Sequence, residues 1–341
     1  MSSNRPVPET CVMERGELSA DDAWRTLRRY GGWHLLRDSF LRFRYGDGFS
    51  HARALGLQLS LAAVPALIAL TGLASDLGLT RGGRVVADTV WALTPGASKS
   101  LVDDLLRDDH RTETIGETAL AFGLVTAVVA LTVAVGQLER GANRIYGVER
   151  DRPALRKYAR ALALAVVAGL PALVGFVMLV AGVPLGESVQ HWYGWGPAAD
   201  TAWAVARWPV SLGLTILTVA ALFRYAPRRH QPGMSWLMFG AGVATGLWWL
   251  ASLLLAAFIQ ASGSFGVTYG ALTAVMALLL WANLTGMALF LGIAFAAQLE
   301  ARRVGVPEPT LPDRWRPADE QLVSAPDAGD ATPHSPSAGV G

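Results

Sequence analysis

Charged residues are scarce in this sequence: Asp, Glu, Lys and Arg make up 16% of its 341 residues, whereas hydrophobic residues make up 52%. Soluble domains normally carry about a quarter charged residues. From Gln231 to Leu299, 69 consecutive positions hold no Asp, Glu, Lys, Arg or His. A helix in a soluble protein needs a polar face towards water. The run therefore excludes an ordinary cytosolic enzyme and a disordered chain, and it predicts an integral membrane protein.

Cysteine and lysine are also scarce. Cys11 is the only cysteine, which excludes an intramolecular disulfide and a cysteine-based metal cluster. Lys99 and Lys157 are the only lysines, so arginine carries almost all of the positive charge. The formal net charge of +2 gives no indication of nucleic-acid binding. The first fifty residues contain no short apolar segment typical of a cleavable signal peptide.

Apolar stretches long enough to cross a bilayer, which takes about 20 residues, recur along the chain. We expect spans at residues 54–75, 118–138, 161–186, 201–223, 234–259 and 271–298. The polar, glycine-rich segment 260–270 separates the last two spans within the charge-free run. The predicted fold class is therefore all-α, a polytopic membrane protein with six transmembrane helices. Pro65, Pro171 and Pro184 fall within these spans and are expected to kink or break their helices.

The distribution of Lys and Arg predicts the orientation. Segments on one side of the six spans hold 23 of these residues, and segments on the other side hold 6. Basic residues accumulate on the cytoplasmic side of membrane proteins, so both termini are expected to be cytoplasmic. In the long first external loop, 76–117, we expect a short amphipathic helix around Leu101 to Leu106.

Three regions follow from this pattern. Residues 1–50 are a cytoplasmic region with amphipathic helices, in which bulky apolar residues alternate with arginine and Gly31 and Gly32 separate two helices. These helices either lie among anionic lipid headgroups or pack beneath the bundle, and the two arrangements are compatible. Residues 51–303 form the six-helix transmembrane domain. Residues 304–341, rich in proline, are expected to be disordered.

No constellation of residues predicts catalysis. The six histidines are scattered, none has a ligand at zinc-site spacing, and no phosphate-binding loop or nucleophile motif occurs. The acidic cluster between Asp103 and Asp109 is read as a solvated helix face rather than a cation site. We therefore expect no catalytic residue, no cofactor and no metal, and we expect that the protein is not an enzyme.

Polar and small residues inside the spans carry more information. Asn283, Thr285 and Gln298 occur in the sixth span, where they either join helices by hydrogen bonds or line a transport pathway. Gly242 and Gly246 form a Gly-x-x-x-Gly step in the fifth span and predict close helix packing. Ala288, Gly292 and Ala296 repeat this pattern in the sixth span. Such motifs allow a homo-oligomer without requiring one.

Three stretches contain short motifs in a fixed order: 137–152, QLERGANRIYGVERDR; 223–232, FRYAPRRHQP; and 246–303, with a Tyr-Gly pair before the sixth span and a closing Gln-Leu-Glu. Together they resemble the YihY/BrkB family, long labelled ribonuclease BN. The first is similar to the family's Asn-Arg-x-Tyr-Gly motif, and the second is similar to its Tyr-x-x-Pro hairpin. The residues that carry the resemblance or suggest a pathway are Asn143, Arg144, Tyr146, Tyr225, Pro227, Tyr269, Gly270, Asn283, Gln298 and Glu300.

The resemblance implies a multi-pass protein of the bacterial inner membrane. The family's Gly-Ala-Glu-Leu-Asn pattern is replaced here by Gly292-Ile293-Ala294-Phe295, so the acid nearest this position is Glu300. Glu139, Asn143 and Tyr146 share one helical face, which either closes a cytoplasmic mouth or latches a neighbouring helix. The basic loop around them has no accompanying histidine or acid cluster, so ribonuclease activity is not expected.

The sequence thus favours a transporter or lipid-moving protein with an unknown small-molecule or lipid substrate. The alternative is a non-transporting envelope or virulence-associated scaffold. The expected partners are membrane lipids, with anionic headgroups at the cytoplasmic face, and no nucleic acid.

Overall fold

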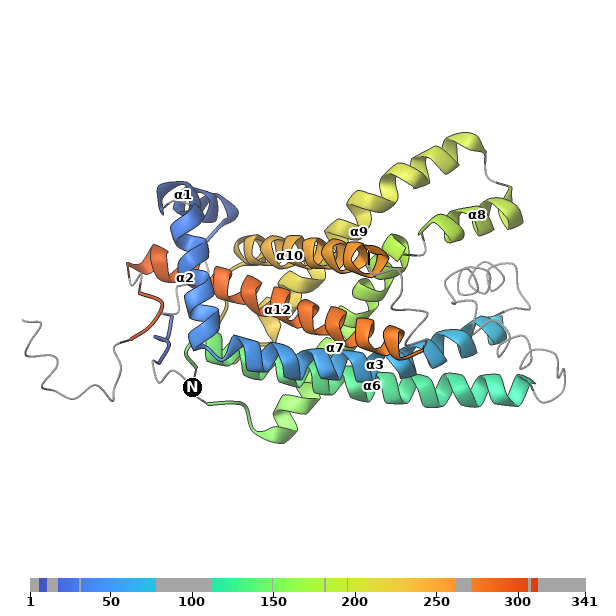
Figure 1. Cartoon of the computed structure of the whole chain (residues 1–341), viewed down its shortest axis with the longest axis horizontal. Coiled ribbons are helices and arrows are strands. Elements are labelled where there is room, and N and C mark those ends of the chain that lie inside the picture. Colours follow the sequence, from blue (N-terminus) through green and yellow to red (C-terminus); the bar gives the residue numbers. More distant parts are fainter. Residues whose placement is uncertain are drawn as a thin grey trace, which may run out of the picture.

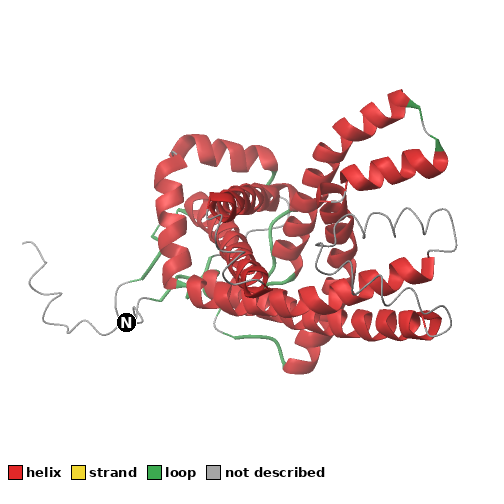
Figure 2. Ribbon diagram, turned by 45° about the vertical axis from the view of Figure 1, so that its right-hand side comes forward, coloured by secondary structure: helices red, strands yellow, loops and turns green. Residues whose placement is uncertain are grey.

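The computed structural model describes residues 6–10, 18–30, 32–77, 112–148, 150–180, 182–194, 196–261, 271–305 and 308–311. Every regular element in these residues is a helix, as Figure 2 shows. The all-α expectation is therefore confirmed for the described part of the chain. The amphipathic helix expected near Leu101 and most of the predicted disordered tail lie outside the described residues.

The helices bear the labels of Figure 1. In chain order they are α1 (Ala20–Tyr30), α2 (Gly32–Tyr45), α3 (Gly48–Leu77), α6 (Thr112–Ile145), α7 (Ala154–Val180), α8 (Gly182–Tyr193), α9 (Pro197–Tyr225), α10 (Met234–Ala261) and α12 (Ala271–Val304). The expected separation of two N-terminal helices near Gly31 is confirmed.

Five helices in the described residues are long and apolar enough to cross a membrane. They are α6, α7, α9, α10 and α12, and they establish a multi-pass membrane protein. The helix α3 covers the first predicted span. Large apolar side chains on these helices face outwards, including Val167 (71% exposed) and Leu253 (65% exposed). Hydrocarbon would cover such side chains in a membrane.

The expected third span, 161–186, extends too far at its C-terminal end. The helix α7 ends at Val180 and α8 begins at Gly182, so Pro184 lies in the first turn of α8. Proline is accepted there because the first backbone N–H groups of a helix have no intrahelical partner. By contrast, α3 continues through Pro65 and α7 continues through Pro171, so neither proline breaks its span.

The helices α3 and α6 run side by side, and α12 packs on α3 and on α10 (Figure 1). The helix α9 contacts both α7 and α10. The N-terminal helix α2 packs on α12 and buries Leu35, Ser39, Arg42 and Phe43. Its other face leaves Trp33 and Phe40 exposed. The segment therefore packs against the bundle and also keeps an aromatic outer face that suits a headgroup layer.

Close helix crossings involve glycines other than the predicted pair. A Cβ on Gly292 would lie 2.6 Å from the carbonyl oxygen of Gly240, so the backbones of α12 and α10 meet there. A Cβ on Gly242 or Gly246 would meet no atom within 4 Å, which contradicts the packing prediction for these two glycines. Small residues lie on both faces of α10, so the sequence alone does not identify the face that packs on α12. The prediction for Gly292 and Ala296 is confirmed, since both contact α10.

Candidate functional site

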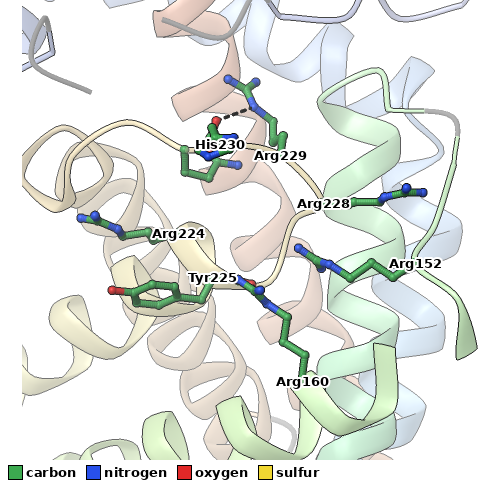
Figure 3. A pocket seen from close by; sticks show the side chains of 8 residues that line it. Arg152, Arg160, Arg224, Tyr225, Arg228, Arg229 and His230 are labelled. Atoms are coloured by element: carbon green, nitrogen blue, oxygen red, sulfur yellow. Dashed lines mark hydrogen bonds between the residues drawn. The ribbon is translucent and has the colours of Figure 1, made fainter. Parts of the chain in front are cut away.

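The connection between α9 and α10, residues 226–233, brings arginines to one end of the bundle. Figure 3 shows Arg228 and Arg229 directed away from each other, so that one loop reaches two different partners. The backbone N–H of Arg228 donates to Asn143 Oδ1 at 2.7 Å. Its guanidinium donates to the carbonyl oxygens of Arg150 and Asp151. This loop is therefore fixed to the α6–α7 connection.

The end of α6 supplies the predicted Asn-Arg-x-Tyr-Gly residues. The N–H of Val148 donates to Asn143 O at 2.8 Å, and the N–H of Gly147 donates to Arg144 O at 3.1 Å. Gly147 has φ +79, a left-handed conformation that glycine adopts at no steric cost. These are the hydrogen bonds of a Schellman helix end. They place Tyr146 just beyond the last turn of α6, fully buried.

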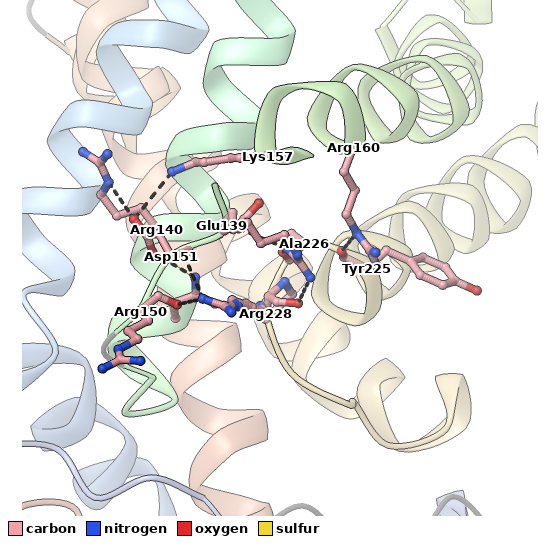
Figure 4. A network of polar contacts seen from close by, with 12 residues as sticks. Glu139, Arg140, Arg150, Asp151, Lys157, Arg160, Tyr225, Ala226 and Arg228 are labelled. Carbon is pink, nitrogen blue, oxygen red and sulfur yellow. Dashed lines mark hydrogen bonds and ion pairs between the residues drawn. The ribbon is translucent and has the colours of Figure 1, made fainter. Parts of the chain in front are cut away.

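Asn143 links the two connections through its side chain. Its Nδ2 donates to Asp151 at 3.0 Å while its Oδ1 accepts from Arg228. Asp151 also pairs with Arg140 at 3.2 Å and with Lys157 at 3.7 Å. Burial opposes ionisation of Asp151, but the Asn143 hydrogen bond and the charges of Lys157 and Arg140 prevail and lower the pKa of this carboxyl. The interactions are drawn in Figure 4.

Glu139 and Arg152 form a second link at the same end. Their side chains pair at 3.0 Å, and Arg152 also donates to the carbonyl oxygens of Ala226 and Pro227 at 2.8 Å each. Burial lowers the pKa of Arg152, and the charge of Glu139 opposes that effect. The predicted face of Glu139, Asn143 and Tyr146 thus holds both loops, which supports the latch interpretation.

Arg42 of α2 is completely buried and donates to three acceptors. These are Ile145 O at 2.9 Å, Gln298 Oε1 at 3.3 Å and Pro8 O at 2.7 Å. Burial lowers the pKa of Arg42 to about 10, so the guanidinium stays charged at neutral pH. In the sequence, Arg42 is one of several arginines in the amphipathic N-terminal segment. No local pattern separates it from its exposed neighbours Arg37 and Arg44.

Arg229 and Glu300 form an ion pair with 4% and 1% of their side chains exposed. Arg229 also donates to Thr10 Oγ1, and its guanidinium carbon lies 4.6 Å from the centre of the Tyr146 ring. Burial raises the pKa of the Tyr146 hydroxyl, so this ring stays neutral beneath the cation. Glu300, near the end of α12, therefore neutralises the charge of the buried Arg229.

The N-terminal residues 6–10 cover this cluster. The N–H of Thr10 donates to Tyr146 O at 3.3 Å, and Pro8 supplies an acceptor to Arg42. A Cβ on Gly147 would lie 2.6 Å from the Glu9 nitrogen. We call the contacts among residues 6–10, Arg42, Asn143, Tyr146, Arg152, Arg229, Gln298 and Glu300 the polar end cluster.

The remaining residues singled out from the sequence are not part of the polar end cluster. Arg144 is exposed, and Tyr225 is 45% exposed while its carbonyl oxygen accepts from Arg160 at 3.0 Å. Asn283 is 15 residues before Gln298 on α12, or about 22 Å along the helix. Within the described structure its Oδ1 is buried and accepts no hydrogen bond. Tyr269 and Gly270 lie outside the described residues.

A basic cavity of about 450 Å³ opens beside the polar end cluster. Its lining consists of Arg152, Arg160, Arg224, Tyr225, Arg228, Arg229, His230 and Gln231 (Figure 3). The sequence pattern of these arginines predicts membrane orientation and gives no indication of a cavity. They line one open cavity because the α6–α7 connection, α7, the end of α9 and the α9–α10 loop converge at this end.

A second cavity, of about 180 Å³, lies between α3, α6, α7, α9 and α12. It is lined by apolar side chains apart from Thr218, whose hydroxyl oxygen is buried and has no hydrogen-bond partner in the described structure. Among the described residues, no group of three His, Cys, Asp or Glu side chains could hold a metal ion. The arrangement therefore offers an apolar space and a cationic space, and α7 and α9 contribute to both.

Comparison with known proteins agrees with the motifs. The family model described as "Virulence factor BrkB" matches residues 39–317. "Putative ribonuclease-like protein YfkH" of Bacillus subtilis is 25% identical over 268 residues, which cover 79% of this chain and 96% of that protein. No solved structure matches.

Two further relatives carry the name "UPF0761 membrane protein". The one from Halorhodospira halophila is 27% identical and the match covers 65% of this chain, while the one from Chromohalobacter salexigens is 26% identical and the match covers 79%. The chain spans 47% and 63% of the length of these two relatives. Because the family model covers most of the sequence and the described helices fit a multi-pass membrane protein, the chain belongs to the BrkB family of membrane proteins.

Proposed function

We propose that this protein moves a lipid-like amphiphile within the bacterial inner membrane, with six spans and both termini in the cytoplasm. The polar end cluster supports this orientation. It joins residues 6–10, the α6–α7 connection, the α9–α10 loop and the end of α12. These are the segments that the distribution of basic residues assigns to the cytoplasm, and they meet at one end of the bundle.

The observation that carries the proposal is the apolar cavity between the spans. Residues from five helices line it, so it is an open crevice between helices rather than a hollow on one helix face. Thr218 offers a polar solute a single hydroxyl group in this lining. The Leu, Val and Ala side chains of the lining can pack against a hydrocarbon chain. Apolar lining favours a lipid chain over a hydrophilic solute.

Reconstitution into liposomes tests the proposal. Fluorescent lipids placed in one leaflet are followed by chemical quenching from outside, with protein-free vesicles as the reference. The intact protein is expected to accelerate lipid movement at least several-fold. No acceleration across lipids with different headgroups would overturn the proposal.

A pair of substitutions on α7 supplies the matched control. Ala168 is 4% exposed and lines the apolar cavity, whereas its neighbour Val167 is 71% exposed on the outer surface. Ala168→Phe is expected to fill the cavity and slow lipid movement, and Val167→Phe is expected to leave it unchanged. Equal rates for both variants would show that the cavity has no part in movement.

Cysteine labelling tests the topology. Replacing Cys11, the only cysteine, with Ser gives a background for single cysteines. A cysteine at exposed Arg156, before the third proposed span, should react with an impermeant reagent only from the cytoplasmic side. A cysteine at exposed Gln190, in α8, should react only from the other side. Labelling of both from the same side would overturn the proposed orientation.

A scaffold that acts through partner proteins is the second candidate. The observation that favours it is the aromatic outer face of α1 and α2, where Trp24 is 47%, Trp33 is 77% and Phe40 is 46% exposed. Photo-cross-linking from position 33 in native membranes distinguishes the two roles of this face. Adducts with lipid place it in the headgroup layer, whereas one discrete protein adduct favours the scaffold.

A further inference from the structure

We infer that the basic cavity binds the phosphate group of an anionic amphiphile whose apolar chain enters the adjoining apolar cavity. This inference rests on the proposed function and names the class of molecule that would be moved. Three observations support it. Some arginines of the basic cavity have no carboxylate partner, some of their guanidinium N–H groups have no acceptor among the described residues, and both cavities have lining residues on α7 and α9.

The cavity has more cationic groups than neighbouring acids neutralise. Five arginines line it. Arg152 is paired with Glu139 and Arg229 is paired with Glu300. Within the described part of the chain, the other lining arginines, Arg160, Arg224 and Arg228, form no ion pair. A dianionic or monoanionic group would balance this local charge.

The available donors suit a phosphate. Arg160 uses Nε to donate to Tyr225 O at 3.0 Å, which fixes the guanidinium at the mouth of the α9–α10 loop. Its terminal nitrogens make no hydrogen bond to a described residue. Figure 3 shows Arg160 and Arg152 approaching this loop from the same side, with Arg224 on the far side of Tyr225. Guanidinium groups bind phosphate oxygens in pairs with good geometry, so such a cluster favours phosphate.

Positive charge at the cytoplasmic end is already expected from membrane topology. Topology requires only that arginines be present on this side, and exposed arginines such as Arg144 and Arg156 meet that requirement. It does not require that five of them line one open cavity of about 450 Å³. A volume of this size is typical of small-molecule sites and accommodates a phosphorylated headgroup.

The two cavities lie next to each other along α7. On α7, Arg160 lines the basic cavity and Leu164 lines the apolar one, four residues or about 6 Å further along the helix. On α9, Leu222 lines the apolar cavity and Arg224 lines the basic one, but residues two apart on a helix lie on different faces. An amphiphile with its phosphate at Arg160 would therefore have its chain beside Leu164.

Equilibrium binding to the purified full-length protein in uncharged detergent tests the inference. The probes are phosphatidate, phosphatidylcholine, diacylglycerol and glycerol 3-phosphate, each measured at low and high salt. Phosphatidate is expected to bind at least tenfold more tightly than diacylglycerol, which lacks the phosphate, and than glycerol 3-phosphate, which lacks the chains. High salt is expected to weaken phosphatidate binding.

Arg160→Gln combined with Arg224→Gln is expected to weaken phosphatidate binding at least tenfold, and Lys at both positions is expected to restore part of it. The matched control is Arg156→Gln, an exposed arginine at the same end of α7 that does not line the cavity. Ala168→Phe is expected to weaken phosphatidate binding but not glycerol 3-phosphate binding. Thermal denaturation confirms that each variant is folded.

Equal losses of phosphatidate affinity in the Arg156→Gln control and in the double variant would overturn the proposed phosphate site. Equal affinity for glycerol 3-phosphate and phosphatidate would assign the cavity to a soluble phosphate and overturn the amphiphile. Binding is measured in detergent and lipid movement is measured in liposomes, so the phosphate site and the proposed function can be refuted independently. Phosphatidate binding without movement in liposomes would refute the proposed function, and movement without dependence on Arg160 and Arg224 would refute the site.

Discussion

Arg229 and Glu300 pair in the interior of the protein, although one lies in the α9–α10 loop and the other at the end of α12. The same arginine lies over the ring of Tyr146, which follows α6. One ion pair thus connects three parts of the chain. Because both side chains are buried, removing either one would leave the other charge without its partner.

Glu300→Ala is expected to destabilise the protein by about 3 to 5 kcal/mol, because it leaves Arg229 as a buried cation without its carboxylate. The thermal midpoint in detergent measures the loss. Arg303→Gln is the control, since Arg303 is 47% exposed and its contact with Asp22 is long, at 3.8 Å. Exposed pairs contribute about 1 kcal/mol or less. Equal effects of the two substitutions would contradict the buried ion pair.

Arg42→Lys is expected to cost about 2 to 4 kcal/mol, since one ammonium group cannot satisfy Ile145 O, Gln298 Oε1 and Pro8 O together. The measured quantity is again the thermal midpoint. Arg37→Lys on the exposed side of the same helix should have little effect. A midpoint for Arg42→Lys within error of the wild type would show that the three hydrogen bonds are not required.

Gly147→Ala should release the N-terminal residues 6–10, because the new Cβ would lie 2.6 Å from the Glu9 nitrogen. Gly305→Ala is a matched control, since φ is +85 there but a Cβ meets nothing within 4 Å. Both variants carry the backbone strain of about 1 kcal/mol that alanine has in this conformation. Only Gly147→Ala is expected to make the N-terminus sensitive to limited proteolysis. Similar cleavage of both variants would contradict this packing.

Gly292→Ala should destabilise the crossing of α10 and α12 by about 1 to 3 kcal/mol, because a Cβ there would lie 2.5 Å from that of Ala244. Gly246→Ala on α10 places its Cβ in open space and is expected to be neutral or slightly stabilising. Comparing the thermal midpoints of the two variants identifies which glycines form the interface. A larger loss at Gly246 would reverse the assignment.

The stability contribution of Asp151 should depend on pH. Its folded pKa lies below the unfolded value of about 3.9, so the contribution is fully present above that value and is lost as pH falls through the folded pKa. Asp151→Asn is expected to cost about 1 kcal/mol at pH 7, and its difference from the wild type should shrink at about pH 3. A difference that stays constant over this range would contradict the role of the ionised carboxyl.

Part of the site could be predicted because its signal is local. Glu139, Asn143 and Tyr146 follow helical periodicity, and all three contact the neighbouring connections through side chain or ring. The basic cavity and the role of Arg42 had no such signal. The three acceptors of Arg42 lie 34, 103 and 256 positions away in the sequence, so only the folded arrangement of the chain identifies them.

Hydropathy along the sequence determined that this is a helical membrane protein and where its apolar helices lie, because burying apolar residues in hydrocarbon is a property of each segment by itself. Tertiary structure alone decided which arginines are buried, which glycines touch and where cavities form. Gly240 and Gly242 are both glycines on α10, yet only Gly240 meets α12. Such choices depend on how distant helices pack, which local composition does not specify.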